Sequence, residues 1–192
     1  IGGVARAELP FDPRGLVAQS MAPSDFVLNP LPNTLFTRDS SCWIGNGVTL
    51  NPMYWPARRE ETLLLAAVYR FHAAFTGTPV LWGDNPTGSL EGGDVMPLAP
   101  GLVLVGMGER SSPQGVASLA KALFAAGSAK KVLVAQLPKS RGAMHLDTVF
   151  TFCDRDLVTV YPEVIHQLRT FIVEPGDAEG QIAVHEQNKP FL

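Results

Sequence analysis

The chain has 192 residues and a formal net charge of −3 at pH 7; 46% of its residues are hydrophobic and 17% are charged. This composition supports a buried core and excludes a disordered chain, and the slight acidity argues against nucleic acid or an anionic membrane surface as the main partner. No apolar run approaches the roughly 20 residues needed to span a bilayer. Two cysteines, Cys42 and Cys153, do not make a disulfide framework, so we expect a cytoplasmic protein.

Both ends of the sequence are abrupt. It starts Ile-Gly-Gly without a Met and stops at Lys-Pro-Phe-Leu. We therefore interpret it as a piece of a longer protein. Residues 1–25 carry scattered Gly and Pro with little periodicity, which predicts a linker or the end of a preceding segment.

The first clear elements follow the prolines near residue 30. A short β-prone piece is predicted over residues 34–37. Strands are predicted over residues 41–44 and 48–50, on either side of Gly45-Asn46-Gly47. Because Gly and Asn tolerate positive φ, this arrangement is typical of a β-hairpin.

A helix is predicted over residues 57–75, where apolar residues recur at helical spacing. Gly77 is well placed to end this helix. Residues 79–82 are then predicted to form a strand, which completes the order strand, strand, helix, strand.

The same order recurs in the next 60 residues. Strands are predicted over residues 94–98 and 102–105, and a further strand over residues 132–137. Between them, Ser112 is a plausible N-cap for a helix over residues 113–126, with Pro113 in its first turn.

A third round is predicted to begin in the stretch 148–161, which gives two strands about Asp154-Arg155-Asp156. A helix is expected from Pro162, and residues 182–184 are too short to assign. Three rounds of one order predict an α/β protein built from a repeated supersecondary unit.

Residues 144–154 form an apolar, β-prone run with two titratable side chains near its start. If the run is a strand, His145 and Asp147 point the same way, about 7 Å apart. An imidazole beside a carboxylate can bind a cation and move a proton. The alternative is a core strand whose polar residues merely begin in solvent.

Charged side chains also stand where three other predicted strands stop. The stretches are Phe36-Thr-Arg-Asp39, Glu91-Gly-Gly-Asp94 and Gly106-Met-Gly-Glu-Arg110. Loops at strand ends of an α/β scaffold are where active sites usually lie. Taken singly, each stretch could equally be a turn or a solvated rim.

Together, Phe36-Thr-Arg-Asp39, Glu91-Gly-Gly-Asp94 and His145-Leu-Asp147 resemble the arginine deiminase family in their order and spacing. The neighbouring segments 32–36, 51–58 and 108–111 support the resemblance. It covers about residues 26–165, and its motifs are far more specific than a lone glycine-rich loop.

The resemblance implies a fold. The family belongs to the guanidine-modifying enzymes, whose pentein-type fold is an α/β propeller of five ββαβ blades. Residues 26–192 are therefore expected to form a partial α/β-propeller catalytic domain with about three of the five blades. Residues 1–25 are expected to be a linker or the remnant of a helical insertion. An unclosed propeller exposes strand edges, so a homo-oligomer is expected.

The resemblance also implies a reaction, the hydrolysis of L-arginine to L-citrulline and ammonia, without metal or cofactor. Asp39 and Asp147 match carboxylates that bind the planar guanidinium, a task suited to paired charge-assisted hydrogen bonds. Glu91 matches the residue that contacts the guanidinium and orients the histidine, and His145 matches the general acid and base. The expected substrate-binding residues are Arg58 and Arg110, on the α-carboxylate, with Asn33, Phe36 and Asp94 as supporting positions.

The family's nucleophile has no counterpart here. It is a cysteine in a C-terminal glycine-rich loop, and attacks the guanidinium carbon to form a covalent amidino intermediate. Cys42 and Cys153 are both interpreted as inert core thiols. The chain alone is therefore expected to be inactive. The tryptophans, including Trp55, are expected to serve packing.

Three alternatives stay open. Agmatine deiminase, dimethylarginine hydrolase and amidinotransferase belong to the same superfamily, although two carboxylate-binding arginines disfavour agmatine. A non-catalytic arginine-binding module would explain the missing cysteine. A metal hydrolase could use His145, Asp147, Asp39 and Glu91, but no pair has a spacing typical of zinc sites.

Overall fold

The computed structural model describes residues 2–83 and 86–192. The helices are α1 (Leu16–Ser20), α2 (Thr37–Ser40), α3 (Arg59–Phe71), α4 (Pro113–Ala125) and α5 (Pro162–Ile165). The strands are β1 (Val4–Ala5), β2 (Phe26–Leu28), β3 (Trp43–Ile44), β4 (Gly47–Thr49), β5 (Val80–Trp82), β6 (Val95–Ala99), β7 (Gly101–Met107), β8 (Ala129–Gln136), β9 (Phe150–Phe152), β10 (Val158–Val160), β11 (Arg169–Pro175) and β12 (Ile182–Gln187).

The first round of strand, strand, helix, strand is confirmed. β3 and β4 pair as an antiparallel hairpin whose turn holds Gly45 at φ 61°, and β5 joins β4 in parallel after α3. The helix is shorter than predicted, because 3₁₀ turns occupy residues 56–58 and 73–75 on either side of it. The strand expected over residues 34–37 is wrong: the Phe36 N–H donates to the Asn33 carbonyl at 2.9 Å, which closes a turn, and α2 begins at Thr37.

The second round is confirmed, and the bounds of its elements are close to the predicted ones. β6 and β7 are antiparallel, and β8 lies parallel to β7 after the crossover through α4. Ser112 caps α4 as predicted, since its Oγ accepts the Gly115 N–H at 3.1 Å, and Pro113 opens the helix.

The third round departs from the expected order. β9 and β10 form the predicted hairpin, but α5 is a single turn and β11 pairs antiparallel with β8 instead of joining β10. Residues 182–184 belong to β12, which pairs with β11. The result is a five-stranded sheet in the order β12-β11-β8-β7-β6. The α/β class is confirmed; no sheet closes among the described residues, and a five-bladed propeller stays a prediction.

His145 and Asp147 do not lie on a strand. Residues 146–148 form a 3₁₀ turn that His145 precedes, and β9 begins only at Phe150. The alternation of strand side chains therefore does not orient this pair. The tight turn brings their side chains together instead, as described below.

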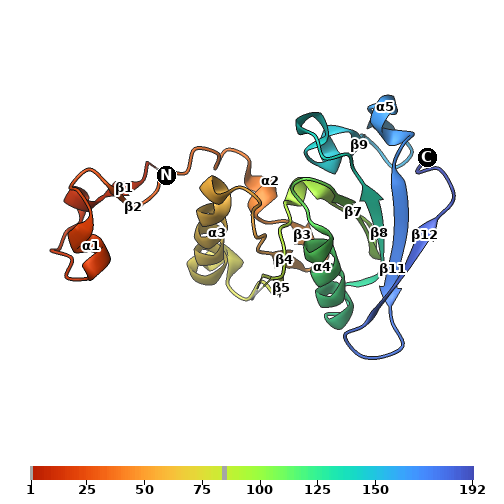
Figure 1. Cartoon of the computed structure of the whole chain (residues 1–192). Coiled ribbons are helices and arrows are strands. Elements are labelled where there is room, and N and C mark those ends of the chain that lie inside the picture. The colour runs from red at the N-terminus through yellow and green to blue at the C-terminus, as the bar shows by residue number, and fades with distance from the viewer. Residues whose placement is uncertain (1, 84–85) are drawn as a thin grey trace.

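Two hydrophobic clusters pack on opposite faces of the large sheet. Val103 and Val105 of β7 contact the α4 side with Leu119, whereas Leu104 between them joins the cluster that contains Phe150. Figure 1 shows α4 lying along the sheet. The second cluster supports the turn at residues 146–148, because Leu146 is fully buried in it.

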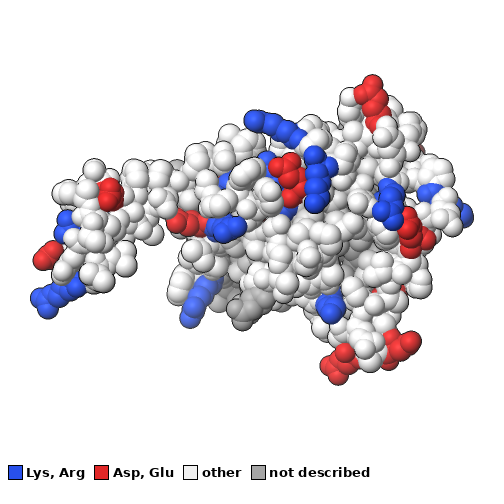
Figure 2. All heavy atoms as spheres, in the orientation of Figure 1, with Lys and Arg blue, Asp and Glu red and all other residues white. Residues whose placement is uncertain are grey.

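The N-terminal part lies apart from this body in Figure 1. It contains the antiparallel pair β1–β2, which spans the boundary expected near residue 25, so the division into 1–25 and 26–192 stays a prediction. Figure 2 shows Lys and Arg interspersed with Asp and Glu on the visible face. Within residues 2–83 and 86–192, no helix combines the length and apolarity that crossing a membrane requires.

Candidate active site

The site is a cavity of about 1100 Å³ where α2, the 3₁₀ turn before α3, the β7–α4 loop and the 141–148 loop meet. Its lining contains seven of the nine residues expected from the sequence: Asn33, Phe36, Asp39, Arg58, Arg110, His145 and Asp147. Glu91 and Asp94 do not line it, because both are fully buried behind it. Segments distant in the sequence thus converge on one hollow.

Asp39 lies in α2 and is buried. Its backbone carbonyl accepts a hydrogen bond from the side-chain amide of Asn51 at 2.8 Å, which fixes the short helix. Its Oδ2 accepts from Nη1 of Arg58 at 2.7 Å, and its Oδ1 lies 3.7 Å from Nδ1 of His145. One oxygen is therefore held by the protein, and the other faces the histidine.

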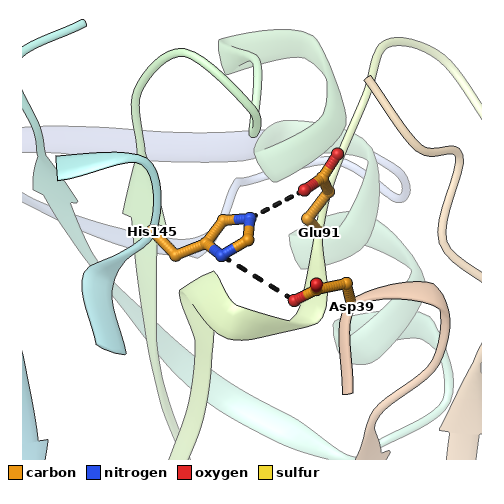
Figure 3. Close-up of side chains that lie close together, drawn as sticks. All are labelled: Asp39, Glu91 and His145. Carbon is orange, nitrogen blue, oxygen red and sulfur yellow. Dashed lines mark hydrogen bonds and ion pairs between the residues drawn. The ribbon is translucent and has the colours of Figure 1, made fainter. Parts of the chain in front are cut away.

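His145 stands between the carboxylates of Glu91 and Asp39, as Figure 3 shows, and Asp147 lies farther from the same ring. Its Nε2 lies 2.7 Å from Oε2 of Glu91, and its Nδ1 lies 4.0 Å from Oδ1 of Asp147. Since an ionised carboxylate only accepts, the imidazole donates to Glu91. Burial lowers the pKa of His145, but the bond to Glu91 and the charges of the surrounding carboxylates outweigh burial, so the pKa is raised.

The carboxylates respond in opposite directions. Burial raises the pKa of Glu91, but the bond to His145, with smaller help from Arg110, outweighs it and lowers the pKa. The pKa of Asp147 is raised, chiefly by burial, with Asp39 adding to the rise and His145 opposing it. The lowered pKa favours the anionic form of Glu91, and the raised pKa favours the protonated form of His145, which is the form that donates a proton.

Asp94 and Ser111 are fully buried behind the residues that line the cavity. Asp94 accepts the Leu146 N–H through Oδ1 at 2.7 Å and the Ser111 hydroxyl through Oδ2 at 2.5 Å. Ser111 Oγ also accepts the Glu91 N–H at 3.1 Å. Burial raises the pKa of Asp94 to about 6, although the Ser111 hydroxyl and His145 oppose the rise. The pair joins the loop of Glu91 to the turn of His145.

The two expected carboxylate-binding arginines differ in how many of their donors are free. Arg58 is buried and donates to Asp39, to the Phe36 carbonyl and twice to Glu61. Arg110 donates to Glu91 at 3.2 Å, and its buried Nε has no hydrogen-bond partner among the described residues. Arg110 is thus the arginine better able to bind a further anion.

Aromatic residues also lie at the cavity. Trp55 lines it, is 46% exposed, packs edge-on against the Tyr54 ring at 5.0 Å and lies with its ring 5.7 Å from the Arg110 guanidinium. Its expected role in packing stays a prediction. Phe36 is also exposed, and the Arg58 guanidinium lies 5.9 Å from its ring. Further lining residues not foreseen are Arg38, Arg141, Met144 and Thr148.

Neither cysteine lines the cavity. Cys42 is buried in the hydrophobic core, where burial raises the pKa of its thiol, as expected for an inert residue. Cys153 is exposed, so its assignment as a core thiol is wrong; it lies just after β9, in the turn toward β10. Among the described residues, no thiol stands beside His145.

A metal ion is the other occupant that the geometry could accept. Asp39, Glu91 and His145 each offer a ligand atom, and these atoms lie within 4.8 Å of one another. However, Asp39 and Glu91 are already paired with Arg58 and Arg110, and two guanidinium groups so close oppose a divalent cation. The arrangement suits a delocalised monocation better.

Residues 2–192 match the family model described as arginine deiminase. The chain belongs to the arginine deiminase family. Solved structures agree in fold. The dimethylarginine dimethylaminohydrolase variant of Pseudomonas aeruginosa, complexed with citrulline, matches at TM-score 0.53 and 19% identity over 68% of this chain and 47% of that one.

Two further neighbours come from larger chains. A variant of AgrE in a binary complex with L-arginine matches at TM-score 0.58 and 23% identity, over 71% of this chain and 19% of that one. ArgZ, an arginine dihydrolase from the ornithine-ammonia cycle in cyanobacteria, matches at TM-score 0.55 and 24% identity, over 69% and 19%. The chain spans about half the length of the dimethylarginine dimethylaminohydrolases that it matches.

Proposed function

We propose that this chain carries the substrate-binding and acid–base part of an arginine deiminase, which hydrolyses L-arginine to L-citrulline and ammonia. The observation that carries the proposal is the convergence of Asp39, His145 and Asp147 on one cavity, with Glu91 buried behind His145 and bonded to it. A planar cation is the ligand that such acidic groups recognise through paired hydrogen bonds. Family membership and neighbours that bind L-arginine or citrulline support this choice.

In the proposed complex the guanidinium lies between Asp39 and Asp147. The second nitrogen of that guanidinium approaches His145, which Glu91 holds in the protonated form. The α-carboxylate reaches the Nη groups of Arg110, which make a single hydrogen bond, to Glu91. Asn33 and Phe36 border the same space, and Asp94 supports the turn of His145 from behind.

The proposed chemistry needs a cysteine thiolate supplied from outside residues 1–192. The thiolate attacks the guanidinium carbon; the C–N bond then breaks, and His145 gives its proton to the departing ammonia. His145 next takes a proton from water, which attacks the amidino carbon. The C–S bond breaks, the hydroxyl proton passes to solvent, citrulline leaves and the thiolate is regenerated.

Calorimetry on the protein tests this proposal. We expect L-arginine to bind with a micromolar Kd and agmatine, which lacks the α-carboxylate, to bind more weakly. Arg110→Gln should remove most of the preference for arginine, whereas Arg155→Gln, the same charge change at the exposed β9–β10 turn, should retain it. A chain that binds neither ligand would contradict the proposal.

A non-catalytic arginine-binding module is the second candidate, favoured by the distance of both cysteines from the cavity. Citrulline formation separates the two. The protein as the cell makes it should convert arginine to citrulline if it is a deiminase. Binding without citrulline at any protein concentration would favour the module.

A further inference from the structure

Glu61, a residue for which the sequence suggested no role, is tied directly to the site. It stands in the first turn of α3 with its side chain only 2% exposed. Its Oε1 accepts from Nε of Arg58 and its Oε2 accepts from Nη2, both at 2.9 Å. Burying a carboxylate is costly unless it is paired, and this one is paired along one whole edge of a guanidinium.

The two hydrogen bonds to Glu61 fix the orientation of the whole Arg58 guanidinium. Because the group is planar and rigid, holding its Nε–Nη2 edge fixes the direction of Nη1. Nη1 then donates to Oδ2 of Asp39 at 2.7 Å, and Nη2 also donates to the Phe36 carbonyl at 3.2 Å. Four of the five N–H groups of Arg58 therefore have acceptors within the protein. Burial lowers the pKa of Arg58, but the hydrogen bonds to Glu61 and then to Asp39 outweigh burial, so the pKa is raised.

This grip decides which oxygen of Asp39 is available. Arg58 covers Oδ2 alone, so that Oδ1 stays directed at His145, 3.7 Å away, on the cavity side. An arginine released from Glu61 could turn both Nη groups onto Asp39, as a fork on a carboxylate. It would then compete with the guanidinium of a ligand for the same two oxygens.

We infer that Glu61 is a positioning residue of this site, which holds Arg58 so that one oxygen of Asp39 remains free for the ligand's guanidinium. The inference rests on the proposed function, because it assumes that Asp39 receives that guanidinium. It also shifts the expected role of Arg58: its main task lies at the guanidinium end of the ligand, and the carboxylate end depends mainly on Arg110.

The test uses Glu61→Gln, with Glu60→Gln as the matched control. Both substitutions remove one acidic charge from the first turn of the same helix, but the Glu60 side chain is bonded to Asn29 and not to Arg58. We expect Glu61→Gln to raise the Kd of L-arginine and of agmatine by the same factor, about tenfold. Glu60→Gln should change neither Kd.

A purely structural Glu61 would change the melting temperature and leave both Kd values alone. Unchanged binding by a folded Glu61→Gln variant would therefore overturn the inference. A loss confined to L-arginine would overturn it as well, because it would place Arg58 at the carboxylate. If Glu61→Gln does not fold, Glu61→Asp decides: it keeps the charge one methylene shorter, and we expect a smaller but equal loss for both ligands.

A ligand-free measurement separates this inference from the proposed function. The Arg58 Nε–H signal in NMR should exchange slowly in the wild type and in Glu60→Gln, and rapidly in Glu61→Gln. Equal exchange in all three proteins would overturn the inference, whatever binds. Absence of arginine binding by the wild type would instead overturn the proposed function, with the exchange result still reporting on the grip of Glu61.

Discussion

The Nε2 atom of His145 lies 2.7 Å from Oε2 of Glu91, although 54 residues separate the two in sequence. Both side chains are buried, and Asp39 approaches the opposite ring nitrogen. The histidine is therefore held between anions that favour its protonated form. This relationship fixes the centre about which the remaining groups of the cavity are arranged.

Asp147→Asn should weaken binding of L-arginine by about 2 kcal/mol, or roughly thirtyfold in Kd, because a neutral amide cannot balance the guanidinium charge. The fold should persist, since Asp147 lies partly exposed at the cavity wall. Calorimetry gives the Kd and a thermal melt checks the fold. The exposed Asp154→Asn serves as control, and equal Kd values for the two variants would remove Asp147 from the site.

Gly93→Ala should crowd the site without creating a cavity in the hydrophobic core. A Cβ on Gly93 would lie 2.7 Å from Nδ1 of His145 and 3.0 Å from Oδ2 of Asp147, so one of these side chains must move. We expect arginine to bind about 5- to 150-fold more weakly, the effect of about 1–3 kcal/mol of overpacking. Gly142→Ala, where a Cβ meets nothing within 4 Å, should bind as the wild type does. Similar affinities in both variants would mean that the floor of the cavity is wider than this geometry implies.

The stability of the protein should depend on Asp94 in a defined pH window. Burial raises its pKa from 3.8 to about 6, so between these values the folded protein holds the proton more tightly than the unfolded chain. The contribution is largest below pH 4 and is lost as the pH rises through about 6, a change of up to about 3 kcal/mol. Urea unfolding of wild type and Asp94→Asn at pH 4 and pH 7 measures it. A difference in unfolding free energy that is the same at both pH values would refute the raised pKa.

Phe150→Ala should lower the free energy of unfolding by about 3–5 kcal/mol, because it leaves a cavity in the cluster beneath the site. Phe150 is 4% exposed and its ring lies 5.2 Å from that of Phe191. Phe152→Ala, at a ring that is 45% exposed, is the control and should cost clearly less. Chemical denaturation of both variants checks this, and equal losses would show that Phe150 contributes no more to the core than the exposed Phe152.

The sequence predicted the elements whose turns or caps depend on a residue acting on its immediate neighbours. The hairpin at Gly45 and the helix capped by Ser112 are confirmed, because Gly and Ser there act on their own neighbours. The strand expected over residues 34–37 failed, since β propensity cannot outweigh a closed turn at Asn33. β11 was missed although Thr170-Phe-Ile-Val173 is a β-prone run, and its pairing with β8 shows the strand.

For the site as well, the sequence motifs located some residues and missed others. Motifs located His145 and the acidic residues around it, but the strand assumed for His145 and Asp147 is a 3₁₀ turn. Glu61 and Ser111 were missed as members of the site, because their importance lies in the partners they reach. A signal existed for Glu61: it stands three residues after Arg58, within reach on one helical turn.

The groups around His145 are widely separated in sequence, which affects when the site can form during synthesis of the chain. Asp39 emerges about 100 residues before the histidine, a delay on the order of 10 s at ordinary elongation rates. Glu91 follows within that interval, and Asp147 emerges only after the histidine. Ability to capture a guanidinium should therefore arise only after the turn at residues 146–148 has been synthesised, which makes ligand binding a reporter of the folding of this part of the chain.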